Sequence, residues 1–320
     1  MNKKIVSIVL SSILAASSYS VSAFAATQNK DDNVVKIIGS NTDPYTLLGL
    51  LPTFCKKQGL DVQYTQKNSA GFDASSGMIQ ALDRQGFDLA TGTLGSALVA
   101  AGKGVDIRVF ANVTSGGSAL ISRPGLNTYQ SLKGKKVAIL KGQHSEQIIS
   151  DAFEKRGLST TGTNADIKVV SFQTDAQPIA FEQGLIDAFN ATYPFSQQYI
   201  DSGKAVLIED YKQVTRAVYT TSKFPQHKET KLRACYQDMM NAVNNPKRIK
   251  EVEQAQADAT AAGYRALTPP KTSIAYTATP LLANEHIVGL LRFLRSIDKV
   301  PLTFTVPAEF NQSYKFTAPK

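Results

Sequence analysis

Strand-like and helix-like patterns of hydrophobic residues alternate along the chain. Short apolar runs typical of strands are separated by longer stretches in which apolar residues recur every three or four positions, as in helices. The first part of the chain predicts strands at 34–38, 60–66, 87–91 and 107–113, with helices at 45–58, 75–84 and 94–101 between them. Strands that alternate with helices favour βαβ units and a parallel sheet.

The alternation of strands and helices continues through the middle of the chain and gives way to a mostly helical pattern near its end. Strands are predicted at 136–140, 168–172 and 186–190, and helices at 145–156 and 175–183. In the helix at 145–156, Ser145 is a capping residue, Glu146 lies in the first turn and Gly157 follows as a stop. Beyond about residue 224 the pattern is mostly helical, with helices predicted at 228–243, 247–262 and 283–296.

These elements predict an α/β fold made of two doubly wound lobes. The first lobe would combine residues 26–113 with 217–320, and the second would be 114–216, so that the chain crosses between lobes twice. Open α/β sheets bind ligands beyond the carboxyl ends of their strands. Two such lobes that face each other therefore predict a ligand cleft between them.

The first 25 residues have the pattern of a cleavable signal peptide. Lys3 and Lys4 give a positive start, residues 5–16 are apolar but too short to span a bilayer, and Ala23-Phe24-Ala25 is a small-x-small cleavage site. The nearest cysteine, Cys55, is far from the cleavage site, which argues against a lipid anchor. We therefore expect a secreted, periplasmic protein that begins at Ala26.

Composition excludes several classes. The 320 residues are 42% hydrophobic and 19% charged, which excludes disorder, and the net charge of +9 is not concentrated in a basic and aromatic run that would bind nucleic acid. The two cysteines, Cys55 and Cys235, lie on predicted helices. In an oxidising compartment they form either a disulfide or two buried free thiols, and the spacing leaves both open.

Five polar loops, most of them with glycine, follow predicted strands and lead into helices. They are residues 40–43, 91–93, 115–118, 141–145 and 190–193. Backbone N–H groups at helix starts attract negative charge, and glycine lets a ligand approach the backbone closely. Converging on one cleft, such loops would hold a small polar or anionic group. Each loop taken alone can also be a simple turn with a helix cap.

Enzyme signatures are missing from the chain. It has no GxGxxG, GxxxxGK[ST], GxSxG or HExxH. Of the three histidines only His144 lies on a predicted ligand loop, whereas His227 and His286 fall in helical stretches, and His286 is expected at the surface. We expect no catalytic residue, no metal site and no cofactor.

Four segments of the chain carry a specific resemblance. They are GFDASSGMIQALDRQGFDLATGTLGSALVAAGKG, VFANVTSGGSALISRPG, SLKGKKVAILKGQHSEQIISDAFEKRGL and FEQGLIDAFNATYPFSQQYIDSG. Together they resemble the periplasmic substrate-binding proteins of ABC importers, in the subfamily for nitrate, aliphatic sulfonates, taurine and thiamine-pyrimidine precursors. The resemblance covers residues 34–207 and, more weakly, the C-terminal helices, and it implies the type II periplasmic-binding-protein fold.

In that family the loops after the strands line the pocket between the lobes. From the resemblance and the loops together, we expect the ligand-binding residues to be Ser40, Asn41, Tyr45, Thr91, Gly92, Thr93, Ser115, Gly116, Gly117, Lys141, Gly142, Gln143, His144, Asn190, Thr192, Tyr193 and Arg216. Where many members have Trp-Glu-Pro-Tyr, this chain has Thr192-Tyr193-Pro194-Phe195, and it contains no Trp. This departure weakens the assignment of an aminopyrimidine ligand, which needs a stacking plane and a carboxylate.

The resemblance implies a binding protein that captures a small molecule and delivers it to an ABC permease in the inner membrane. We favour a small organic anion such as an alkanesulfonate, because Lys141, His144 and Arg216 are cationic candidates for an oxyanion head. The alternatives are a pyrimidine-type vitamin precursor as ligand, or an enzyme on the same fold. We expect a monomer with no nucleic-acid partner.

Overall fold

The computed structural model describes residues 30–41, 45–67, 72–141, 144–172, 176–212, 215–266 and 276–316. Contacts within the chain divide it into residues 1–32 and one compact unit, Asn33–Lys320. The predicted signal peptide and its cleavage site lie outside the described residues. Within the part that the structure describes, no helix combines the length and apolar character that crossing a bilayer requires.

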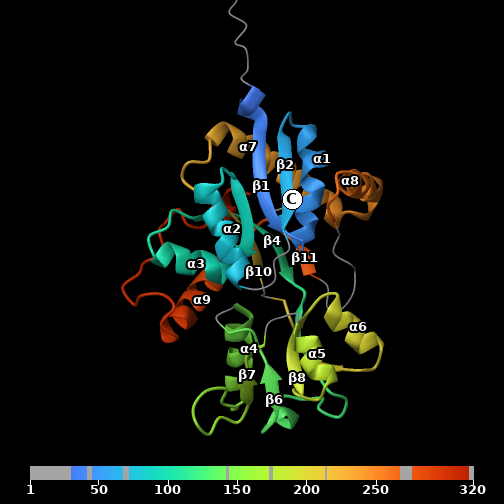
Figure 1. The fold of residues 1–320 in the computed structure, drawn as a ribbon, viewed down its shortest axis with the longest axis vertical. Helices are drawn as coiled ribbons and strands as arrows, with labels where there is room; N and C mark the ends of the chain where they lie inside the picture. The colour runs from blue at the N-terminus through green and yellow to red at the C-terminus, as the bar shows by residue number, and fades with distance from the viewer. Residues whose placement is uncertain are drawn as a thin grey trace, which may run out of the picture. The chain divides into compact units, whose positions relative to one another are not determined.

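A six-stranded sheet, here called sheet A, contains the first strands of the chain (Figure 1). Strand β1 pairs in parallel with β2 and β3, and β10 lies antiparallel between β3 and β4, with β11 at the edge beside β4. In spatial order the strands are β11 (Tyr276–Ala278), β4 (Arg108–Gly116), β10 (Thr215–Thr220), β3 (Leu89–Thr93), β1 (Val34–Ser40) and β2 (Asp61–Lys67).

A five-stranded sheet, sheet B, is built from the middle of the chain. Strand β6 pairs in parallel with β7 and β8, while β5 lies antiparallel between β8 and β9. In spatial order the strands are β7 (Lys168–Val170), β6 (Lys136–Ala138), β8 (Ala188–Thr192), β5 (Ser118–Ser122) and β9 (Val206–Tyr211).

Helices join and cover the strands. The apolar positions of α4 that the sequence predicted, among them Ile148, Ile149 and Phe153, are buried against sheet B. The helices are η1 (Lys30–Asn33), η2 (Tyr45–Leu50), α1 (Leu51–Lys56), α2 (Phe72–Arg84), α3 (Leu94–Gly102), η3 (Gln130–Leu132), α4 (His144–Glu154), α5 (Ala176–Glu182), α6 (Phe195–Asp201), α7 (Gln226–Asn244), η4 (Pro246–Arg248), α8 (Ile249–Ala261), α9 (Asn284–Ser296) and η5 (Ser313–Lys315).

The chain passes between the sheets at two places. Strand β4 ends at Gly116 and β5 begins at Ser118, so Gly117 alone separates the sheets there; Gly116 and Gly117 have φ of +90° and +68°, which favour glycine. The return runs from the end of β9 to Thr215 at the start of β10. Both crossings lie a few residues from the predicted boundaries at 113 and 216. The two-lobe division itself stays a prediction, in which each sheet would be the core of one lobe.

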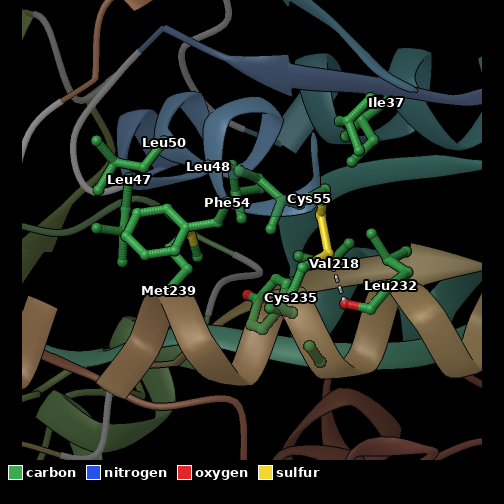
Figure 2. Packing of buried hydrophobic residues seen from close by; sticks show 14 of the residues in the cluster. Ile37, Leu47, Leu48, Leu50, Phe54, Cys55, Val218, Leu232, Cys235 and Met239 are labelled. Atoms are coloured by element: carbon green, nitrogen blue, oxygen red, sulfur yellow. Dashed lines mark hydrogen bonds between the residues drawn. A yellow bond between two sulfur atoms is a disulfide. The ribbon is translucent and has the colours of Figure 1, made fainter. Parts of the chain in front are cut away.

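A disulfide between Cys55 and Cys235 joins α1 to α7. Their Cα atoms are 4.9 Å apart and both side chains are fully buried in an apolar cluster with Phe54 and Leu232 (Figure 2). Of the two alternatives that the sequence left open, the structure has the disulfide. The Cys235 sulfur also lies 3.3 Å from the Leu232 carbonyl oxygen, but a disulfide sulfur has no proton to donate, so this is a packing contact.

The predicted helix at 45–58 is divided in two. It begins as the 3₁₀ segment η2 and continues as the short helix α1, in which Pro52 follows the first residue. Proline has no N–H to donate to the carbonyl four residues earlier, so it starts a helix better than it continues one. The strands β5, β9, β10 and β11 and the helix α6 were not predicted.

Candidate ligand-binding site

Arg216 lies at the crossing between the sheets. It is the second residue of β10, its side chain is only 7% exposed, and its backbone N–H donates to Asn112 Oδ1 at 3.1 Å. Its Nη1 donates to the carbonyl oxygen of Gly116, the last residue of β4, at 2.6 Å. The guanidinium is therefore held at the point where the chain leaves sheet A.

Tyr45 and His144 are electrostatic neighbours of Arg216. Burial raises the pKa of the Tyr45 phenol well above its ordinary value, and the charge on Arg216 opposes that rise. Burial, with smaller contributions from His286 and Arg216, lowers the pKa of the His144 imidazole to about 3. At neutral pH the phenol thus keeps its proton and the imidazole is uncharged, so each offers a hydrogen-bond donor beside a fixed positive charge.

Asn112 holds two of the predicted residues in place. It is fully buried in β4, its Nδ2 donates to Ser115 Oγ at 3.2 Å, and its Oδ1 accepts from the backbone of Arg216. Its own carbonyl oxygen accepts a hydrogen bond of 2.8 Å from the Tyr236 hydroxyl on α7. Because all three bonds are buried or partly buried, Asn112 fixes the end of β4 relative to the start of β10.

The sheet B side of the crossing carries a second set of polar contacts. Ser118 Oγ donates to Asn190 Oδ1 at 2.7 Å, and the backbone N–H of Tyr193 donates to the carbonyl oxygen of Gly117 at 3.0 Å. Asn190 is 7% exposed. The loop after β8 thus lies against the crossing between β4 and β5, and Thr192 is the last residue of β8.

Thr91 and Thr93 on β3 use their hydroxyl oxygens for hydrogen bonds within the protein. The backbone N–H of Ser40 donates to Thr91 Oγ1 at 3.1 Å, and Thr91 is fully buried. Thr93 caps α3 by accepting from the backbone N–H of Ser96 at 3.3 Å, and Gly92 pairs with Ala217 in β10. The Thr93 hydroxyl thus acts as a helix cap, which is the alternative that the sequence left open for each loop.

Lys141 lines a hollow beside helix α4. It is exposed and lines a hollow of about 460 Å³ together with Glu146, Thr160 and Lys168. On α4, position 146 is two residues from 144, which places it about 200° around the helix from His144. Glu146, which lines the hollow with Lys141, therefore lies on the opposite face of α4 from His144.

Three further predicted residues are Asn41, Gly142 and Gln143. Asn41 is half-buried, and its carbonyl oxygen accepts from Arg265 Nη1 at 3.3 Å. Gly142 and Gln143 lie outside the described residues. Among the residues that the structure describes, no group of three or more His, Cys, Asp or Glu side chains is placed to hold a metal ion.

The sequence analysis missed His286. It was expected at the surface, but it is half-buried on α9, and its ring centroid lies 5.8 Å from that of His144. His286, Leu290 and Leu294 are spaced four residues apart, and both leucines are fully buried, so the helical period contained a signal for its burial. Asn112, which supports two predicted residues, was also missed, whereas Ser118 belongs to the predicted loop 115–118.

Known proteins identify the family and the fold. The family model described as NMT1/THI5 like matches residues 53–245, more than half of the chain. No curated protein matches the chain. Several of the solved structures that match are named as sulfonate-binding or nitrate-binding proteins, and at their low identities the likeness concerns the fold alone.

Three of these solved structures show how closely the fold agrees. The alkanesulfonate-binding protein SsuA from Xanthomonas axonopodis pv. citri, bound to MOPS, has a TM-score of 0.60 and 16% identity over 84% of this chain and 94% of that one. The aliphatic sulphonate binding protein SsuA from Escherichia coli has a TM-score of 0.63 and 17% identity over 86% and 97%. The nitrate-binding protein NrtA from Synechocystis PCC 6803 has a TM-score of 0.62 and 13% identity over 85% and 83%. The chain belongs to the NMT1/THI5-like family and has the mixed α/β fold of the type II periplasmic binding proteins.

Proposed function

We propose that this protein is the solute-binding component of an ABC importer, exported to the periplasm through a cleavable signal peptide, and that it captures a small organic anion such as an alkanesulfonate. It would deliver the anion to a permease in the inner membrane. Family membership, the fold and the names of the similar structures support a binding protein rather than an enzyme.

The observation that carries the anion assignment is the buried guanidinium of Arg216 beside Tyr45 and His144. A sulfonate has one negative charge and three acceptor oxygens. A guanidinium matches such an oxyanion in charge and geometry, and charge-assisted hydrogen bonds in a site with little water are stronger than neutral ones. The phenol of Tyr45 and the uncharged imidazole of His144 add donors without adding charge.

The site in this proposal is centred on the crossing between the sheets. Ser115 near the end of β4, Asn190 in β8 and Tyr193 just after β8 have hydrogen bonds at this crossing and are polar candidates for the rest of the ligand. The remaining predicted residues stay part of the proposal, except that the anion head is assigned to the buried Arg216 rather than to the exposed Lys141.

Ligand capture would close two lobes over the anion. The crossings at Gly116 to Ser118 and at Tyr211 to Thr215 are the candidate hinge, because only short segments join the sheets there. A ligand that contacts both lobes favours the closed state by its differential affinity. The radius of gyration measured by solution scattering should therefore decrease when the ligand saturates the protein.

Calorimetric titration with a panel of ligands tests the proposal. The panel contains alkanesulfonates, carboxylates, nitrate and neutral pyrimidines, and we expect an alkanesulfonate to bind most tightly. Ser115→Ala should weaken its binding roughly three- to tenfold, on the order of 1 kcal/mol for one neutral hydrogen bond. Ser122→Ala is the matched control, because Ser122 is a buried serine at the far end of β5 whose hydroxyl donates to the Leu126 carbonyl oxygen.

Two other outcomes would change the assignment. Binding of neutral heterocycles alone would replace the anion by a vitamin-precursor ligand. Chemical conversion of a bound compound would favour the enzyme on the same fold.

A further inference from the structure

Helices α4 and α9 touch along matching turns, although they pack on different sheets. The apolar residues of α4 are buried against sheet B, and those of α9 are buried with residues of β4 and β10 in sheet A. The imidazole centroids of His144 and His286 are 5.8 Å apart, with an angle of 56° between the rings. One turn further, a Cβ atom added at Gly289 would lie 3.4 Å from Gln147 Nε2. The two helices therefore run alongside each other in the same sense over that turn.

Both imidazoles in this contact have a buried nitrogen without a partner. Nδ1 of His144 and Nδ1 of His286 are inaccessible to solvent and make no hydrogen bond in the structure. His144 as a whole is 5% exposed. An unpaired buried nitrogen is tolerated in an uncharged ring far better than in an imidazolium, which carries two N–H donors and a full charge.

The groups around the pair disfavour a charge on His144. From β10, Arg216 brings a fixed positive charge, and His286 adds to its effect from α9. Tyr45, from η2, is an electrostatic neighbour of Arg216 and is uncharged. Two carboxylates are near: Glu285 acts on His286 in the opposite direction, and Asp151 on α4 accepts a hydrogen bond of 2.9 Å from Gln147 Nε2.

We propose that the His144–His286 pair is a pH-sensitive latch between α4 and α9, which keeps the ligand site closed while both rings are uncharged and releases it when they are protonated. The latch rests on the proposed function only in that the closed site holds a ligand. It gives His286 a role as a positioning residue, because it acts on the site through His144.

The direction and size of the pH effect follow from the two states of His144. In the closed contact its pKa is about 3, whereas an imidazole released into water titrates near 6.5. Closure is therefore fully favoured above pH 6.5 and weakens as the pH falls from 6.5 toward 3. For His144 alone, affinity should fall about tenfold between pH 7.5 and 5.5 and about a hundredfold by pH 4.5. Burial also lowers the pKa of His286, which adds to the effect in the same direction.

Binding of ethanesulfonate measured by calorimetry at pH 7.5 and 5.5 tests the latch, because this anion keeps its charge over that range. We expect the wild type to lose about tenfold in affinity at the lower pH. His286→Gln should reduce that loss, and His144→Gln with His286→Gln should remove it. His227→Gln is the matched control, because His227 is exposed on α7 and should leave the pH dependence as in the wild type.

Proton NMR of the protein, recorded with and without saturating ethanesulfonate, gives a second readout. The chain has three histidines, so substitution of each in turn assigns the three imidazole signals. In the ethanesulfonate complex the His144 signal should titrate well below pH 6.5, and its midpoint should shift upward in His286→Gln. A His144 midpoint near 6.5 in the complex, or equal pH dependence of affinity in the wild type and the double variant, would overturn the latch. If ethanesulfonate binds at no pH, the proposed ligand is wrong, and the same two measurements with whichever ligand of the panel binds decide the latch.

Discussion

The disulfide between Cys55 and Cys235 should supply a large part of the stability of the protein. It closes a loop across a sequence separation of 180 residues, which contains all of sheet B. The chain-entropy relation gives about 5 kcal/mol for a loop of this length at 25 °C. Because residual structure in the unfolded chain reduces this value, we expect Cys55→Ala with Cys235→Ala to lower the free energy of unfolding by about 3 to 5 kcal/mol.

Alanine is the appropriate replacement at both positions. The two side chains are fully buried in the apolar cluster of Figure 2, where a serine hydroxyl would add the cost of an unpaired polar group. Removing the sulfur atoms also leaves small cavities, and the urea midpoint of the variant includes their cost.

Urea unfolding followed by circular dichroism measures the difference. Reductant should lower the midpoint of the wild type toward that of the double variant and leave the double variant unchanged. A double variant within about 1 kcal/mol of the wild type would refute the loop-closure reasoning. Intact mass before and after alkylation shows independently whether the two thiols are free.

Single substitutions at three positions test local features of the fold by the same urea unfolding. Thr93→Ala should lower stability by about 1 kcal/mol because it removes the cap of α3, whereas Thr93→Ser should retain most of it. Gly49→Ala should cost about 1 to 3 kcal/mol, since the new Cβ would lie 2.6 Å from the carbonyl oxygen of Arg265. Gly77→Ala in α2 meets nothing within 4 Å and should instead raise stability by up to about 1 kcal/mol.

Elements with strong local signals were predicted closely. The helix expected at 145–156 is α4, His144–Glu154, because its apolar stripe faces the core and Gly157, with φ of +72°, ends it. The strand expected at 34–38 is β1, Val34–Ser40, whose parallel neighbours on both sides are β2 and β3. In both cases the residues that decide the structure lie within the element or a few residues beyond its end.

Elements that depend on distant partners were harder to predict. Strand β10, Thr215–Thr220, has a mixed polar sequence and owes its conformation to antiparallel pairing with β3 and β4 on either side. The segment at 45–58 had the period of a single helix, but Pro52 divides it.

In the candidate site, too, residue types could be predicted from the sequence, but contacts between distant segments could not. Arg216 and His144 were expected as cations. Burial, with smaller contributions from His286 and Arg216, lowers the pKa of His144 to about 3, so its imidazole is uncharged at neutral pH. Lys141 was expected with them, and it lines a hollow with Glu146. The contact of His286 with His144 joins helices far apart in the chain, so no local pattern contains it.

The most direct test of the proposed function is the affinity of an alkanesulfonate for Arg216→Gln. Losing the guanidinium removes one charge-assisted hydrogen-bonding group, so affinity should fall roughly ten- to a hundredfold, on the order of 1.5 to 3 kcal/mol. Arg123→Gln is the matched control, because Arg123 also donates to backbone carbonyl groups, at Phe181 and Ile186, but lies beyond the far end of β5. We predict that ethanesulfonate binds the wild type and Arg123→Gln alike and Arg216→Gln much more weakly. Equal binding to Arg216→Gln would contradict an anion site centred on Arg216.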